Sequence, residues 1–148
     1  MNIDYNVAEV TLSYNPRNTQ KTKVMGSADA YRILLPTFRE GTIHHREYFK
    51  VLFLNNANDV LGCTQISEGG ITNTYVDVRI ILQAALLTNA TSLILAHNHP
   101  SGSLKPSSED RKLTESIKQA AALLQIRVVD HLIMSDDSFY SFVDYGLI

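Results

Sequence analysis

The sequence has few of the features that mark secreted or membrane-spanning proteins. Its one cysteine, Cys63, cannot form a disulfide within the chain, and we expect a buried structural thiol rather than a nucleophile. No apolar run approaches the roughly 20 residues that a membrane-spanning helix needs. The first residues lack the basic and apolar regions of a signal peptide. We therefore expect a cytoplasmic protein with no membrane partner.

An excess of charge of one sign is also absent. The chain carries 13 basic and 15 acidic side chains, for a net charge of −2, so it has no general attraction to nucleic acid or to anionic membranes. Hydrophobic residues make up 45% and charged residues 19%, which is typical of a folded globular protein. A length of 148 residues fits one domain with a proper core.

Apolar periodicity predicts strands that alternate with helices. The expected elements are a half-buried strand at 10–14, a helix capped by Ser27 and ended by Pro36, strands at 48–54 and 60–66, a helix at 77–88, a strand at 92–96, a helix at 108–124, and strands at 126–134 and 139–143. Antiparallel hairpins at both ends favour an α/β fold with a mixed β-sheet flanked by helices. Residues 1–26 would form an N-terminal strand and arm, and residues 27–148 the domain.

The residues that carry chemistry are concentrated between positions 97 and 110. His97 and His99 end a strand, where alternate side chains point to the same side and their Cα atoms would lie about 6.6 Å apart. Both rings can therefore bind one zinc ion, while Asn98 points the other way and can hold down the loop. Asp110, in the first turn of the next helix, can add an oxygen ligand. Three protein ligands leave a fourth tetrahedral position for water, as a catalytic zinc requires.

These residues also fit ordinary structural roles. A His-x-His pair by itself is more often unrelated to metal binding, and Ser107 with Asp110 three residues later resembles a capping box. Asp110 would then only complement the helix dipole. The buried strand before the histidines and the helix after them supply the context that a metal site needs, and they favour zinc.

The complete spacing resembles the JAMM motif of the JAB/MPN+ metalloprotease domain. The matching residues are His97-x-His99-x(7)-Ser107-x(2)-Asp110. The segments 97–102, 130–131 and 140–142 are similar to the RadC branch, and the likeness runs from about Ser27 to the C-terminus. The resemblance implies a mixed sheet related to the cytidine-deaminase fold, a Zn²⁺ cofactor on the two histidines and Asp110, and hydrolysis of peptide or isopeptide bonds in a protein substrate.

The same resemblance requires one upstream glutamate that faces the metal-bound water. Glu47 begins the strand 48–54 and matches the family position, whereas Glu68 lies in a glycine-flanked turn. We expect Glu47 to be the general base, because a base must be held rigidly at hydrogen-bond distance from water. The structural alternative is a surface carboxylate paired with Arg46 or His45. Ser107 would donate a hydrogen bond to the developing oxyanion, cap the helix, or do both.

The remaining histidines are assigned less specific roles. His131 follows Asp130 in a strand, and we expect a buried histidine whose ring is satisfied by the backbone, although a role beside the metal or substrate stays open. His44 and His45 precede a strand and are expected to be solvated.

Two other functions stay open. One is a RadC-type DNA-repair or mobile-element accessory protein that acts on or near nucleic acid, but only Arg17, Lys21 and Lys23 form a basic arm, and no helix-hairpin-helix segment is expected before Ser27. The other is a non-catalytic scaffold, which the intact ligand pattern argues against. The substrate itself, the oligomeric state and the role of residues 1–26 do not follow from the sequence.

Overall fold

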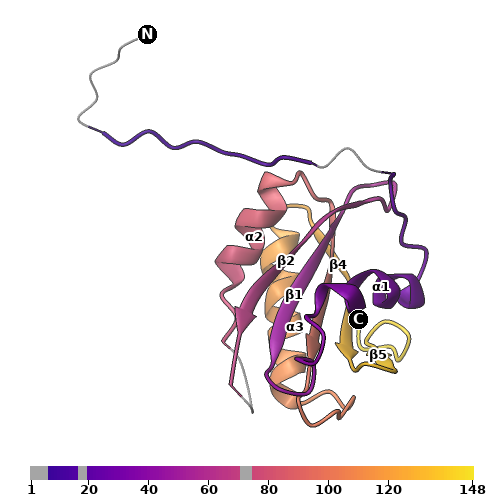
Figure 1. Cartoon of the computed structure of the whole chain (residues 1–148). Coiled ribbons are helices and arrows are strands. Elements are labelled where there is room, and N and C mark those ends of the chain that lie inside the picture. The colour runs from indigo at the N-terminus through magenta and orange to yellow at the C-terminus, as the bar shows by residue number, and fades with distance from the viewer. Residues whose placement is uncertain (1–6, 17–19, 71–74) are drawn as a thin grey trace.

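The computed structural model describes residues 7–16, 20–70 and 75–148 (Figure 1). The strands are β1 (Tyr48–Leu54), β2 (Val60–Glu68), β3 (Ser92–Asn98), β4 (Arg127–Met134) and β5 (Phe139–Ser141). The helices are α1 (Ser27–Leu34), which continues into a 3₁₀ turn (Leu35–Thr37), α2 (Val78–Leu87) and α3 (Ser108–Ala122). The predicted elements from position 27 onward are all present, and several of their ends differ by one or two residues.

The strands form one mixed sheet in the order β2-β1-β3-β4-β5. Strand β1 pairs antiparallel with both β2 and β3, β3 pairs parallel with β4, and β4 pairs antiparallel with β5. The parallel pair requires a crossover, and α3 provides it. The predicted α/β class with a mixed sheet flanked by helices is confirmed.

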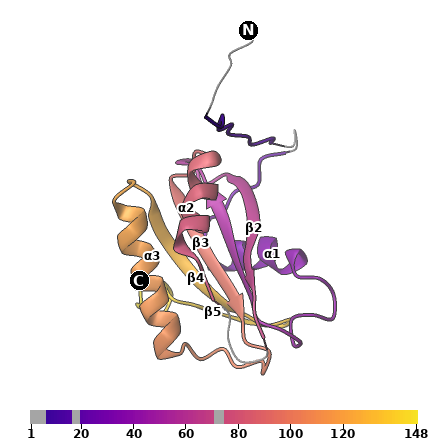
Figure 2. The same ribbon diagram turned by 90° about the vertical axis from the view of Figure 1, so that its left-hand side faces the viewer.

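Helices cover both faces of this sheet (Figures 1 and 2). Helices α2 and α3 lie on one face, and α1 lies on the other. The central strands β1 and β3 are buried along their whole length, because both of their faces are covered. Two apolar clusters result, one on each face; the first contains Phe49, Ile81 and Ile117, and the second contains Leu34, Leu52 and Leu132.

The predicted strand at 10–14 is wrong. This segment is extended but pairs with no strand in the described part of the chain, and Val10 and Leu12 are 83% and 81% exposed. Tyr14 donates a side-chain hydrogen bond to the Leu61 carbonyl at the start of β2. Alternating apolar residues predict a strand only where a partner edge is available, and the pattern alone does not provide one.

Two smaller expectations are also corrected. Gly26, not Ser27, is the N-cap of α1; Ser27 is the first helical residue, and its hydroxyl donates to the Asp144 carboxylate at 2.6 Å. Cys63 is exposed rather than buried, because it lies on the edge strand β2. Neighbouring protein atoms still desolvate its thiol and raise the pKa of Cys63, so the thiol is not activated as a nucleophile.

Among the described residues, the helices are too short or too polar to cross a membrane.

Candidate metal centre

The site lies where β3 ends, on the sheet face that α2 and α3 cover. His97 is 2% exposed and points to that face, whereas Asn98 is fully buried on the opposite face. The Asn98 side chain accepts a hydrogen bond from the Tyr48 N–H at 2.8 Å and donates to the carbonyls of Ile43 and Arg46. The expectation that Asn98 points away from the histidines and anchors a loop therefore holds: it anchors the segment that leads into β1.

The donor atoms of three residues converge on one point. The Nε2 atoms of His97 and His99 lie 3.0 Å apart. The two carboxylate oxygens of Asp110 lie 3.2 Å from these nitrogens, one oxygen against each ring. Ligand atoms around a tetrahedral zinc with bonds of about 2.0–2.1 Å are separated by about 3.3 Å. The separations of these donor atoms are compatible with ligands of one tetrahedral metal ion.

The capping box places Asp110 at this point. The Ser107 N–H donates to the Asp110 carboxylate at 2.8 Å, and the Asp110 N–H donates to the Ser107 hydroxyl at 3.0 Å. The structural and the chemical interpretations of Asp110 are therefore compatible, since the same carboxylate caps α3 and faces both histidines. Burial opposes ionisation of this carboxyl, but hydrogen bonds from His97 and His99 outweigh it and hold the pKa of Asp110 well below its usual range.

His99 is oriented by its own loop. Its Nδ1 lies 2.8 Å from the Ser103 carbonyl oxygen, which can only accept a hydrogen bond, so Nδ1 carries the proton. Gly102, with a φ of +81°, forms the turn that brings this carbonyl back. In the neutral ring the lone pair is therefore on Nε2, which faces Asp110. The hydrogen bond to Asp110 raises the pKa of His99.

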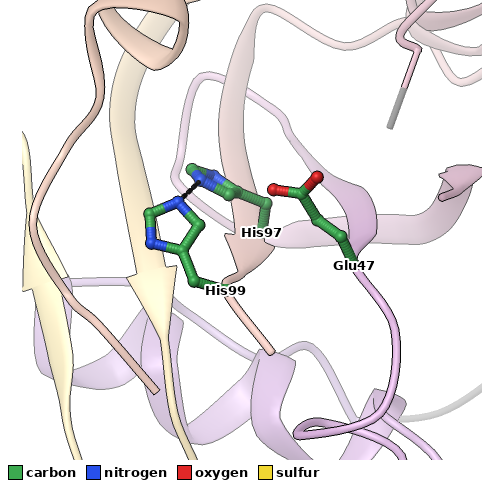
Figure 3. A group of neighbouring side chains, drawn as sticks. All are labelled: Glu47, His97 and His99. Atoms are coloured by element: carbon green, nitrogen blue, oxygen red, sulfur yellow. Dashed lines mark hydrogen bonds between the residues drawn. The ribbon is translucent and has the colours of Figure 1, made fainter. Parts of the chain in front are cut away.

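Glu47 faces the two histidines, and Glu68 does not. Glu47 is 6% exposed, and its carboxylate and the ring nitrogens of His97 and His99 all lie within 4.8 Å of one another (Figure 3). Backbone hydrogen bonds to Gly69 and Gly70 hold Glu47 just before β1. Glu68 instead pairs with Arg46 at 2.6 Å, and its side chain is 41% exposed. Arg46, one of the two partners that the structural alternative gave to Glu47, thus pairs with Glu68 instead.

These groups open into a cleft of about 590 Å³. Its polar lining residues include His97, His99, Asp110, Glu47 and Ser107. Its mainly apolar lining residues are Phe49, Tyr75, Val76 and Leu113, and Glu109 also lines it. The cleft is the place where a substrate can reach both Glu47 and the histidines.

His131 is where the sequence-based expectation fails. Its ring is fully buried, but side chains rather than the backbone satisfy it: Nε2 lies 2.7 Å from His97 Nδ1, and Nδ1 lies 2.6 Å from the Thr114 hydroxyl. Burial lowers the pKa of His131 well below its usual value. Thr114 was not foreseen, although its position four residues after Asp110 on a helix is a signal that could have found it. His44 is exposed as expected and pairs with Asp136.

Comparison with known proteins places this geometry in a family context. The model of the family described as the RadC-like JAB domain matches residues 24–147. A UPF0758 protein of Flavobacterium johnsoniae is 46% identical over 125 residues, which cover 84% of this chain and 53% of that protein. A UPF0758 protein of Histophilus somni is 41% identical over 140 residues, covering 95% of this chain and 62% of the relative. The UPF0758 protein YeeS of Escherichia coli is 45% identical over 103 residues, or 70% of each chain. The chain thus spans little more than half the length of the first relative.

Proposed function

Since this chain belongs to the RadC-like JAB domain family, we propose that it is a zinc-dependent hydrolase that cleaves peptide or isopeptide bonds. The observation that carries the proposal is the convergence of the His97 and His99 Nε2 atoms on the two oxygens of Asp110, next to a buried glutamate. Three such ligands leave one position of a tetrahedral metal open, and an open position distinguishes a catalytic zinc from a structural one.

His97, His99 and Asp110 would hold the metal. Glu47 with the two histidines is a second set that can bind an ion. We favour Asp110 as the third ligand because it contacts both rings at 3.2 Å and the capping box holds it there. The carboxylate of Glu47 is then assigned to proton transfer rather than to metal binding.

Glu47 and Ser107 would carry out the proton transfer and stabilise developing charge. Zinc in this position would polarise the scissile carbonyl and lower the pKa of water. Glu47 takes a proton from the attacking water and gives it to the leaving amine, which balances hydrolysis of an amide to an acid and an amine. The Ser107 hydroxyl accepts the Asp110 N–H, so its own proton is free to stabilise the oxyanion of the tetrahedral intermediate.

The residues that line the cleft support a peptide as the substrate. Its apolar lining residues Phe49, Tyr75, Val76 and Leu113 suit the side chains of an extended peptide bound beside the proposed ligands. We propose a protein substrate, with nucleic acid as the less favoured partner.

Metal analysis and a substrate screen test this function. Protein purified without added zinc should contain one zinc per chain, and the variants His97→Ala and Asp110→Ala should contain little. A peptide and isopeptide library should then yield a substrate that the metal-loaded protein cleaves and the chelator-treated protein does not. Equal metal content in all three proteins would contradict the proposal that His97 and Asp110 bind the zinc ion.

A further inference from the structure

The ring of His97 has a second nitrogen, and that nitrogen faces the buried His131. The Nδ1 atom of His97 and the Nε2 atom of His131 lie 2.7 Å apart, so one of them donates a hydrogen bond to the other. His131 is fully buried between Phe142, which stacks on its ring, and Phe49, which meets the ring edge-on. Which nitrogen donates decides whether His97 presents a lone pair or a proton to the metal position.

Thr114 decides the direction of this hydrogen bond. The hydroxyl of Thr114 has a single proton, and it donates that proton to the Asp110 carbonyl oxygen at 2.7 Å. It must therefore accept from His131 Nδ1, which lies 2.6 Å away. A neutral His131 that is protonated on Nδ1 has its lone pair on Nε2. In a neutral His97 ring, Nδ1 then donates and the lone pair is on Nε2, the atom that faces Asp110.

These contacts close a ring through three elements of the fold. Asp110 and Thr114 are one turn apart on α3, His131 is on β4, and His97 is on β3. We propose that Thr114 and His131 are positioning residues that set the tautomer and orientation of His97, so that Nε2 is ready to bind the metal. The inference rests on the proposed metal site, because a tautomer matters to function only if His97 is a ligand.

The tautomer can be measured without metal. Long-range ¹H–¹⁵N correlation spectra of the metal-free protein distinguish a ring protonated on Nδ1 from one protonated on Nε2. We expect His97 and His131 both to be protonated on Nδ1 in the unaltered protein. In Thr114→Val, His131 loses the acceptor for its Nδ1 proton and both of its tautomers should be populated. A His97 ring protonated on Nε2 but not on Nδ1 in the unaltered protein would overturn the inference, whatever the metal content.

Zinc affinity, measured by competition with a chelator, tests the consequence. Thr114→Val keeps the shape of the side chain but removes the hydroxyl, and Thr114→Ser restores it. We expect Thr114→Val to weaken zinc binding by roughly 10-fold and His131→Phe, which keeps a ring between the two phenylalanines, by up to roughly 100-fold. Thr114→Ser and His131→Gln, whose amide oxygen can accept from His97, should recover much of the loss.

A matched control separates positioning from general loss of packing. Thr91 lies near the other end of β3, and its buried hydroxyl has no hydrogen-bond partner within the described residues. Thr91→Val should leave zinc affinity unchanged. The inference fails if Thr114→Val binds zinc as tightly as Thr91→Val, or if Thr114→Ser is no better than Thr114→Val. An unaltered protein that binds no zinc would instead refute the proposed function. The tautomer spectra of the metal-free protein would still test whether Thr114 and His131 set the tautomer of His97.

Discussion

His97 and His99 point at the same place but are held by different parts of the molecule. His97 is part of the buried sheet, and the side chain of His131, 34 residues away, hydrogen-bonds its Nδ1. His99 lies just after β3 with 17% of its side chain exposed, and a carbonyl only four residues away hydrogen-bonds its Nδ1. One half of the site therefore depends on how three elements pack, and the other half depends on one loop.

This difference predicts which changes alter only chemistry and which also alter stability. A ligand in the core is also a packing residue, so its removal leaves a cavity and an unpaired buried group. A ligand on a loop has few such neighbours. Loss of the proposed metal through a change in the core and loss through a change in the loop can therefore be distinguished by a measurement of unfolding.

The largest effect is expected for removal of either histidine. His97→Ala and His99→Ala should both lose zinc, but only His97→Ala leaves His131 with an unpaired ring nitrogen in the core. Urea unfolding of the metal-free proteins should show a loss of roughly 3 kcal/mol for His97→Ala and less than about 1 kcal/mol for His99→Ala. Equal losses would mean that the two halves of the site are not held differently.

The next effect separates Glu47 from the ligands. Glu47→Gln should retain zinc and lose hydrolysis by roughly 10²–10⁴-fold, since the amide cannot accept the proton of water. Glu68→Gln is the matched control, because Glu68 is a glutamate at the other side of the β1–β2 hairpin and pairs with Arg46. Steady-state rates and zinc content of both variants decide the assignment. A loss of turnover in Glu68→Gln alone would transfer the role of the base to Glu68.

A smaller loss of zinc affinity is expected from a change in the loop that orients His99. Gly102→Ala places a side chain at a φ of +81°, which costs about 1–2 kcal/mol and should move the Ser103 carbonyl away from His99. Zinc affinity should fall by up to roughly 10-fold. Gly146→Ala introduces the same strain at a φ of +74° near the C-terminus and should leave zinc binding unchanged. Equal zinc affinity in the two variants would show that the loop does not position His99.

The weakest interaction is expected between the protein and duplex DNA. Lys21 and Lys23 of the basic arm both lie beside Asp59, at 3.9 and 3.1 Å, and Arg17 lies outside the described residues. We expect duplex DNA to bind no more tightly than roughly 10⁻⁴–10⁻⁶ M at physiological salt, in the non-specific range. A salt titration with a labelled duplex measures this. Nanomolar binding that is lost when Arg17, Lys21 and Lys23 are changed would favour the nucleic-acid function.

The sequence by itself determined the parts of this protein that depend on local pattern. The apolar run of β1 was predicted with its observed bounds, and the hairpin followed from the turn between two apolar segments. The His-x-His spacing and the capping box involve residues within one strand end and one helix start. Strand alternation and helix capping act over a few residues, so the sequence alone was enough to identify His97, His99 and Asp110 as candidates.

Only the tertiary structure decided the contacts between distant residues. The segment 10–14 has a strand-like pattern but no partner strand among the described residues, and a strand forms only with a partner. The position of Glu47 beside the histidines depends on the pairing of β1 with its neighbouring strands and on the hydrogen bond from the Tyr48 N–H to Asn98. The contact of His131 with His97 and Thr114 depends on the parallel pairing of β3 with β4 and on the packing of α3. No local periodicity encodes these contacts, because they arise only when separate elements pack together.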